Sequence, residues 1–258
     1  FDGDGDRDVV TTNSDSSTFS YFANKGDGTF SAKVDYKTED FPSGIYGADF
    51  DGDGDQDVVV TNKISHTFSY FASKGDGTFS AKEDYRTGTN PEGIYATDFD
   101  GDGDIVLANS DYVYGGFCFF ENYGGGTFSP RTDYKVKEGR CPNFIYAADF
   151  DGDGDNDVVI TNAGGFGFKE KLFSYFTNKG DGTFSEPVDY ETGEEPYGIS
   201  ATDFDGDKDI DVVTVNSYAN TFSYFENIFI PTPTPTPTPT PGATTVSITP
   251  PTQTVSAG

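Results

Sequence analysis

Aspartates at alternate positions are the residues of this sequence with the clearest chemical potential. Residues 49–57 read Asp-Phe-Asp-Gly-Asp-Gly-Asp-Gln-Asp, which places carboxylates at loop positions 1, 3, 5 and 9 and glycine at position 6. Ca2+ takes about six to eight oxygen ligands, so a tightly turned loop can direct several carboxylates at one ion. Mg2+ keeps more of its waters, and transition metals prefer the His or Cys side chains that the loop lacks. The pattern therefore predicts Ca2+ binding, with a backbone carbonyl added at position 7.

Other calcium loops also begin with alternating aspartates, but they differ in what surrounds them. An EF-hand needs flanking helices and a bidentate Glu roughly twelve residues into the loop, where this sequence has Val60. Dockerin-type loops are excluded for the same reason, and tandem nonapeptide calcium rolls repeat about every nine residues. A loop that joins two strands remains.

The acidic segment recurs five times at a nearly constant interval. Of the 33 aspartates, 23 lie in these segments, whose middle aspartates are Asp2, Asp51, Asp100, Asp151 and Asp205. In the second, third and fourth units an apolar run precedes the segment, and a β-branched run, an aromatic run such as Phe-Ser-Tyr-Phe and a turn such as Gly-Asp-Gly-Thr-Phe follow it. Short runs rich in Val, Ile, Thr, Phe and Tyr, bounded by Gly, Asn or Asp, are typical of strands. The sequence therefore predicts four strands in each unit.

Aromatic residues on both faces of the third strand indicate sheets that neighbouring sheets cover on both sides. The predicted fold class is all-β, a β-propeller of four-stranded blades, because most strands of a sandwich would carry a polar outer face. The five blades are predicted at about 1–42, 43–91, 92–142, 143–196 and 197–230. The fifth ends at Phe229 after its third strand, so we expect these blades to be part of a seven-bladed propeller in a longer protein.

The sequence changes character after the repeats. Residues 231–242 alternate Pro and Thr, which is typical of an extended polyproline II spacer. Val246 and Ile248 then resume strand-like alternation. We expect residues 243–258 to begin a truncated immunoglobulin-like or cohesin-like module.

The acidic loop and the turn together resemble a known repeat. The Asp-x-Asp-x-Asp-Gly-x-x-Asp loop followed by the Gly-Asp-Gly-Thr-Phe hairpin is similar to the FG-GAP or VCBS repeat of integrin-alpha-type propellers, over residues 1 to about 229. The resemblance implies Ca2+ bound in each loop, with the residue at position 7 ligating through its carbonyl. Carried over position by position, it implies the ligands Asp2, Asp4, Asp6 and Asp8; Asp49, Asp51, Asp53, Asp55 and Asp57; Asp98, Asp100, Asp102 and Asp104; Asp149, Asp151, Asp153, Asp155 and Asp157; and Asp203, Asp205, Asp207, Asp209 and Asp211.

The five loops are not equal. The second and fourth are complete, whereas the first would need a ligand before Phe1. In the fifth, Lys208 replaces a glycine at a position that favours positive φ, which should cost about 1 kcal/mol and bring a cation beside the metal. The third loop is two residues shorter, so either Asp104 takes the ninth position or one ligand is missing.

The charge balance narrows the function classes. With 44 acidic and 16 basic side chains the net charge is -28, which excludes nucleic acid and anionic membrane surfaces as partners. No stretch is long and apolar enough to cross a bilayer. Calcium modules of modest affinity are typical of extracellular proteins, so we expect a secreted or cell-surface location and metal binding coupled to folding. Cys118 and Cys141 could form a disulfide or remain free thiols.

No catalytic motif is apparent, and the chain is predicted to be a binding protein rather than an enzyme. His66 is the only histidine, and the paired carboxylates are accounted for by metal. In blades of this topology the loops opposite the acidic segments line one face, and these loops differ between units. Aromatic and cationic residues of that face are the candidate ligand contacts: Tyr112, Tyr114, Arg140, Phe166, Phe168, Lys169 and Tyr197.

The expected function is a calcium-stabilised extracellular binding or adhesion module that recognises a glycan or a protein. The alternative is an accessory propeller domain of a secreted polysaccharide-degrading enzyme. The sequence leaves the ligand and the oligomeric state open.

Overall fold

The computed structural model describes residues 1–99, 103–111, 113–164 and 170–226. Among the predicted site residues, Asp100, Asp102, Tyr112, Phe166, Phe168 and Lys169 lie outside the described residues, as do the Pro-Thr segment and the residues after it. The described residues form strands and one 3-10 turn, η1 (Ser14–Ser16). They contain no helix with the length and apolarity that a membrane span requires.

The strands form five antiparallel sheets in which sequential strands are neighbours. The second, third and fourth sheets have four strands, and the first and fifth have three. The first sheet lacks the strand before its acidic loop, and the fifth ends, within the described residues, at its third strand. The strands in chain order are β1 (Val9–Asn13), β2 (Thr18–Phe22) and β3 (Val34–Lys37); β4 (Pro42–Ala48), β5 (Asp57–Asn62), β6 (Thr67–Phe71) and β7 (Glu83–Arg86); β8 (Pro91–Thr97), β9 (Asp104–Asn109), β10 (Gly116–Phe120) and β11 (Thr132–Lys135); β12 (Arg140–Ala148), β13 (Asp157–Gly164), β14 (Leu172–Phe176) and β15 (Val188–Glu191); and β16 (Pro196–Thr202), β17 (Asp211–Asn216) and β18 (Thr221–Phe225).

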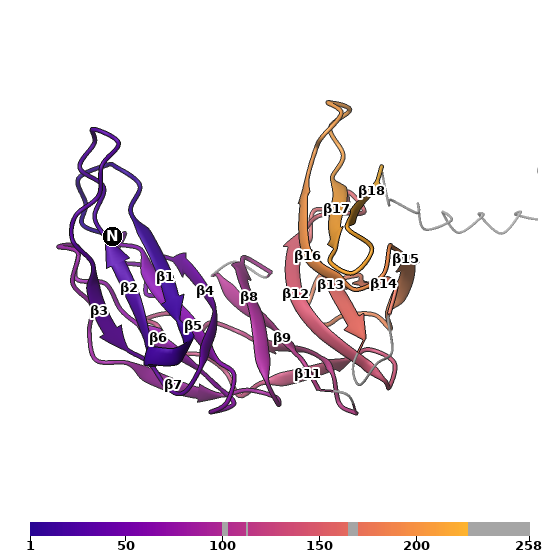
Figure 1. Cartoon of the computed structure of the whole chain (residues 1–258), viewed down its shortest axis with the longest axis horizontal. Coiled ribbons are helices and arrows are strands. Elements are labelled where there is room, and N and C mark those ends of the chain that lie inside the picture. The colour runs from indigo at the N-terminus through magenta and orange to yellow at the C-terminus, as the bar shows by residue number, and fades with distance from the viewer. Residues whose placement is uncertain (100–102, 112, 165–169, 227–258) are drawn as a thin grey trace, which may run out of the picture.

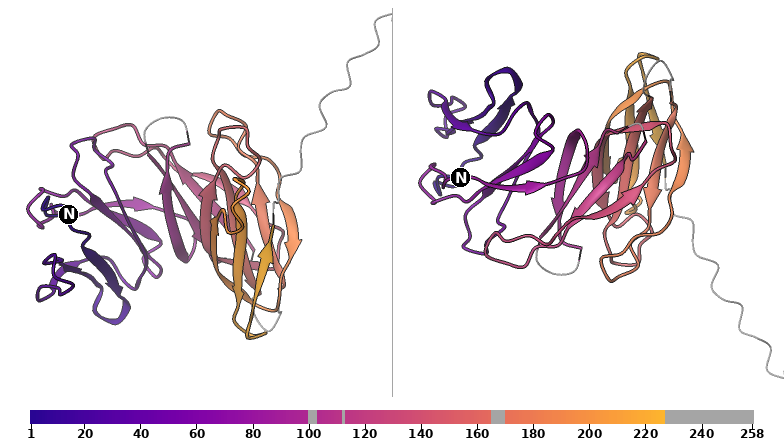
Figure 2. Two further views of the ribbon diagram at one scale, coloured as in Figure 1. Left: turned by 90° about the horizontal axis from the view of Figure 1, so that it is seen from above. Right: turned by 90° about the horizontal axis from the view of Figure 1, so that it is seen from below.

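The sheets follow one another along an open arc, with the first and fifth sheets at its two ends (Figures 1 and 2). The first strands of the second to fifth sheets, β4, β8, β12 and β16, contact one another in sequence. Four apolar clusters fill the spaces between successive sheets. The predicted all-β architecture of propeller blades buried on both sides is therefore confirmed, with the ring not closed in these residues.

The connection between the third and fourth strands is a tight hairpin, as its Gly-Asp-Gly sequence predicts. In the second sheet Thr78 donates its backbone N–H and its hydroxyl to Asp76 Oδ1, at 3.0 and 2.5 Å. Lys74 N–H donates to Thr78 O at 3.0 Å, and a bridge pairs Ser73 with Phe79. Lys74, Gly75 and Asp76 are thus part of the turn.

Both cysteines are free thiols, so the disulfide alternative is wrong. The reason lies in a polar relay that each complete sheet repeats. In the second sheet Asn62 Nδ2 donates to Ser69 Oγ at 2.9 Å, and Ser69 donates to Asp84 Oδ1 at 2.6 Å. Cys118 takes the serine position in the third sheet, where Asn109 donates to Sγ and Sγ donates to Asp133 Oδ1, at 2.8 and 3.0 Å.

Candidate metal centre

The second acidic loop connects β4 to β5 and is shaped by hydrogen bonds to its own carboxylates. Asp49 accepts the backbone N–H groups of Gly52 and Gly54, at 2.8 and 3.0 Å. Gly52 and Gly54 have φ values of 81° and 94°, which only glycine adopts without strain. Asp51 and Asp53 each accept the N–H of the second residue that follows, at 3.1 and 2.8 Å. The alternating Asp-Gly sequence therefore curls the loop around its own side chains.

The ninth-position aspartate anchors the loop to the sheet. Asp57 opens β5 and is completely buried. Its carboxylate accepts the N–H groups of Phe50 and Ser73, at 3.0 and 2.7 Å, and the hydroxyl of Tyr70 at 3.0 Å. The tyrosine hydroxyl was not anticipated from the sequence, although the Tyr of the aromatic run recurs in four of the five units and could have indicated a polar role.

Carboxylate oxygens converge in three of the loops. Among the described residues, each of three groups offers one ligand atom per residue, all within 4.8 Å of one another; the groups are Asp49, Asp51 and Asp53; Asp149, Asp151 and Asp157; and Asp203, Asp205 and Asp211. These clusters contain only oxygen donors. They could hold a metal ion, and they include the second and fourth loops, the two that the sequence marks as complete.

The electrostatics of the loops favour a cation. Burial, the largest cause, raises the pKa of Asp157 to about 7, against hydrogen bonds from Asn178 and Tyr175 that lower it. Burial followed by the neighbouring carboxylates raises the pKa of Asp151, and burial is also the first cause of the raised pKa values of Asp51 and Asp57. A nearby divalent cation favours the charged forms and reverses these shifts.

The fifth loop repeats this geometry with one strained residue. Gly206 and Lys208 donate their N–H groups to Asp203 at 2.6 and 3.1 Å, as the two glycines do in the second loop. Lys208 has a φ of 83°, so the predicted positive-φ position is confirmed. Its side chain borders a hollow of about 520 Å3 that the fourth loop also lines, through Asp149 and Asp151.

The third and first loops depart from the pattern as their sequences indicate. Asp104 is buried at the start of β9 and accepts the N–H groups of Phe99 and Asn122, at 3.3 and 2.8 Å, so it takes the ninth position. Its sheet has Phe119 where the second has Tyr70, and phenylalanine has no hydroxyl to donate. In the first loop the amino group of Phe1 pairs with Asp8 Oδ2 at 3.1 Å.

The acidic loops and the Gly-Asp-Gly hairpins lie at the same face. Any side chain at Gly75 would collide with the carboxylate of Asp55, the residue expected to ligate through its carbonyl. Adjacent loops also touch, because Asn156 Nδ2 donates to Asp98 O at 2.7 Å. The first-to-second and third-to-fourth connections thus share one face, as the up-and-down topology predicts.

The opposite face carries the remaining predicted contacts, with different exposures. Tyr114 is 69% exposed, and Lys135 Nζ lies 5.4 Å from its ring centroid. Tyr197 is exposed, and its ring packs against the ring of Phe144 with the two centroids 5.2 Å apart. Arg140 is buried instead, where its guanidinium makes two bonds to Asp189, at 2.5 and 3.1 Å. The structure therefore places Arg140 inside the molecule rather than at a loop tip.

Two aromatic residues of this face were missed by the sequence reasoning. Phe41 immediately precedes β4 and Phe144 lies in β12, and with Tyr197 in β16 they line a hollow of about 300 Å3 beside the Lys63–Glu92 ion pair. Phe41 holds a φ of 59°, a strained value for a bulky residue. Both occupy positions whose residue type differs between units, which was the available signal.

Comparisons with known proteins agree with this geometry. The family model described as the FG-GAP-like repeat matches residues 1–60, 49–108, 103–160 and 149–214. Comparison with curated protein sequences gives no match. A solved structure of a candidate 6-phosphogluconolactonase from Bacteroides uniformis is similar at 18% identity and a TM-score of 0.63, covering 84% of this chain and 63% of that one. A protein from Lactobacillus plantarum is similar at 14% identity and a TM-score of 0.55, covering 86% and 68%.

At these identities the two structures show the fold alone, and this chain spans 63% of the length of the first. The repeat matches are stronger evidence of family membership, because they extend over most of the sequence and coincide with the acidic loops. They suggest a propeller-like binding module and confirm the resemblance that the loop and hairpin motifs indicated. Because its matched repeats run from residue 1 to residue 214, the chain belongs to the FG-GAP-like repeat family.

Proposed function

We propose that this chain is an extracellular binding module whose blades are stabilised by Ca2+ in the acidic loops and whose opposite face recognises a glycan or a protein. The observation that carries the proposal is the convergence of carboxylate oxygens within 4.8 Å in three loops of the same design. Oxygen donors in a flexible loop suit Ca2+ better than Mg2+ or a transition metal. The family also supports it, because FG-GAP repeats often bind calcium and are typical of extracellular proteins.

Calcium has a structural task in this arrangement. The net charge is -28, and the raised pKa values in the loops reflect carboxylates held in partly buried, crowded positions. A bound cation offsets this repulsion and ties the end of the first strand to the start of the second. Binding of an ion to the folded chain then adds directly to its stability.

The ligand would bind at the face opposite the metal. Phe41, Phe144 and Tyr197 expose aromatic surface at the first strands of three different sheets, the second, fourth and fifth. Rigid aromatic side chains around an ion pair, here that of Lys63 and Glu92, are typical of recognition surfaces.

A binding screen with the calcium-loaded chain tests the proposal. Immobilised polysaccharides and extracellular matrix proteins are the probes, and Phe144→Ala and Tyr197→Ala are the site variants. Tyr123→Ala is the matched control, because Tyr123 is 59% exposed in the turn that follows the third strand, on the acidic-loop face. The proposal expects the site variants to weaken binding of any captured probe at least tenfold and the control to leave it unchanged. Equal binding by all variants would remove the aromatic hollow as the ligand site.

A further inference from the structure

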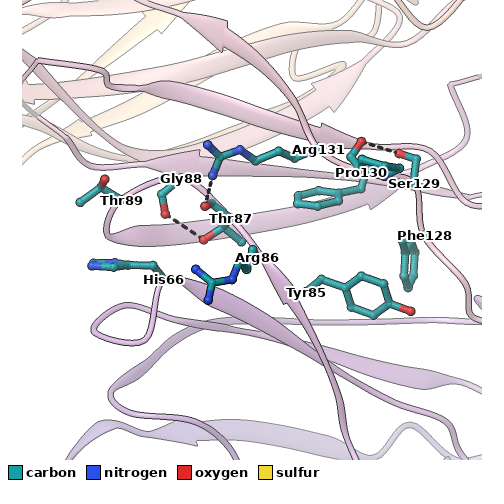
Figure 3. A pocket seen from close by; sticks show the side chains of 11 residues that line it. His66, Tyr85, Arg86, Thr87, Gly88, Thr89, Phe128, Ser129, Pro130 and Arg131 are labelled. Atoms are coloured by element: carbon teal, nitrogen blue, oxygen red, sulfur yellow. Dashed lines mark hydrogen bonds between the residues drawn. The ribbon is translucent and has the colours of Figure 1, made fainter.

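A cleft of about 690 Å3 opens between the second and third sheets, and it gathers positive charge on a strongly acidic protein. Its walls include Arg86 at the end of β7, His66 before β6 and Arg131 before β11. The cationic ends of the two arginines and the His66 ring lie toward one end of the cleft, and Phe128 and Pro130 lie toward the other (Figure 3). Only 16 of the 258 residues are Lys or Arg, so two arginines and the single histidine in one cleft need an explanation.

Two of the other inter-sheet junctions show what this one lacks. Between the first and second sheets, Lys82 Nζ pairs with Glu39 Oε1 at 2.6 Å and also with Asp84. Between the third and fourth sheets, Lys137 Nζ pairs with Asp189 Oδ2 at 2.7 Å. At both junctions a cation of one sheet therefore pairs with a carboxylate of its neighbour.

Repeat positions align the second junction with the first. Thr38 and Thr87 donate equivalent backbone N–H bonds at 3.0 Å to the carbonyls of the residues that precede β2 and β6, Ser17 and His66. The residue after Thr38 is Glu39, whereas the residue after Thr87 is Gly88. Arg131 takes the position of Lys82, and its Nη1 donates to the backbone carbonyl of Thr87. The cation is thus kept at this junction, but the facing carboxylate is absent.

The acidic groups near the cleft are already engaged. Asp133 lies 3.3 Å from Arg131 Nε and also accepts the thiol of Cys118. Asp111, close to His66, accepts the N–H groups of Val113 and Tyr114 at 2.8 Å each. His66 Nδ1 accepts the N–H of Asn90, and Arg86 forms no ion pair within the part of the chain that the structure describes.

We propose that this cleft binds a small organic carboxylate of the size of a sugar acid, whose carboxylate takes the place that Glu39 holds at the first junction. Two arginine guanidinium groups match a planar carboxylate through paired hydrogen bonds. The Thr87 hydroxyl donates to Gly88 O at 2.9 Å and can still accept a hydrogen bond, which suits a ligand that also carries hydroxyl groups. A net charge of -28 repels polyanions at long range, which favours a ligand with a single negative charge over an acidic peptide or a multiply charged phosphate.

The cleft is separate from the aromatic hollow. The proposed ligand site rests on the proposed function only because the cleft requires the folded, calcium-loaded blades. Titration of the full chain in calcium buffer with D-glucuronate, D-glucose and inorganic sulfate, followed by NMR, tests it. We expect glucuronate to bind, glucose to give no saturable shift, and sulfate to bind more weakly than glucuronate. Arg131→Gln and Arg86→Gln should each weaken glucuronate binding about tenfold, the loss expected when one charged hydrogen-bond partner is removed.

Lys82→Gln is the matched control, because Lys82 holds the position of Arg131 at a junction that has its own carboxylate. It should leave glucuronate affinity within about twofold, since it does not touch the cleft. Thr89→Glu should abolish binding by placing a carboxylate in the cleft. Any one of four results would overturn the proposal. Glucose could bind as well as glucuronate, sulfate could bind as tightly as glucuronate, an acidic peptide could bind more tightly, or both arginine variants could keep the wild-type affinity. A chain that stays folded in calcium but ignores glucuronate refutes the cleft alone, whereas indifference to calcium refutes the proposed function.

Discussion

The ring of Phe68 meets the ring of Phe120 edge-on, with centroids 4.9 Å apart, and this contact joins the second sheet to the third. The same edge-on contact joins each of the three remaining pairs of successive sheets, with ring centroids 4.9 to 5.0 Å apart. The pairs are Phe19 and Phe71, Phe117 and Phe176, and Phe173 and Phe225. Each first-named phenylalanine also stacks on a tyrosine of the last strand of its own sheet. One aromatic pair per junction therefore recurs along the arc.

Replacing Phe68 with alanine should destabilise the chain strongly. Phe68 is completely buried, so the change removes its apolar contacts and leaves a cavity, at a cost of about 3–5 kcal/mol. Phe222 holds the same position in the fifth sheet but is 68% exposed, and Phe222→Ala should cost no more than about 0.5 kcal/mol. Urea unfolding of both variants measures the difference. Equal losses would mean that the fifth sheet is covered as the others are.

Lys208→Gly should stabilise the fifth loop. Lys208 holds a φ of 83°, and relief of that strain is worth up to about 1 kcal/mol, part of which the greater freedom of glycine in the unfolded chain offsets. Removal of the Lys208 ammonium group should also tighten calcium binding at this loop, and calorimetric titration with calcium measures this change. The reverse change, Gly154→Lys, moves the strain and charge to the fourth loop, where the backbone has a φ of 100°. An increase in stability with Gly154→Lys would contradict the account.

Arg140 and Asp189 form a pH-dependent latch within the fourth sheet, between the first residue of β12 and strand β15. Burial raises the pKa of Asp189, but hydrogen bonds from Arg140, Lys137 and Ser174 outweigh it and lower the pKa to about 2. The ionised pair therefore stabilises the fold above the ordinary carboxyl pKa of about 3.8, and this contribution disappears as pH falls toward 2.

Arg140→Gln should cost about 1.5–3 kcal/mol near neutral pH, the worth of hydrogen bonds between charged groups. The gap between wild type and variant should shrink as pH falls from about 4 to 2, because the wild-type carboxylate then loses its charge. Lys137→Gln is the control, since its exposed side chain contributes at most about 1 kcal/mol. A gap that does not depend on pH in thermal melts would refute the latch.

Cys118 should be unreactive in the folded chain. Burial, followed by the hydrogen bond to Asp133, raises its pKa to about 12, so almost no thiolate forms at neutral pH. A thiol reagent should label it only on unfolding, after which two thiols per chain are found without prior reduction. Cys118→Ser should fold normally, because serine holds this position in the other sheets. An increase in thiol count after reduction would show a disulfide instead.

Much of the architecture could be predicted because its determinants are local. The Asp-Gly alternation sets the acidic loop, and the glycines at the equivalent positions of the other loops are enough to predict the strain at Lys208. Contacts between residues that lie far apart in the sequence could not be predicted from these local patterns. The burial of Arg140 depends on Asp189, which lies 49 residues away, and the cleft depends on how Gly88 and Arg131 face each other across a junction. Only spatial superposition of the repeats shows which carboxylate has been lost.

The account depends most on calcium in the acidic loops, and a thermal melt in calcium and in excess chelator tests this directly. At an ion concentration one hundred times the dissociation constant, each occupied site adds about 2.7 kcal/mol, and each kcal/mol raises Tm by roughly 2–4 °C in a chain of this size. We therefore expect Tm to rise by several degrees per occupied loop in calcium and to fall back with chelator, with Asp49→Asn and Asp149→Asn each reducing the rise. The same Tm in calcium and in chelator would contradict the account.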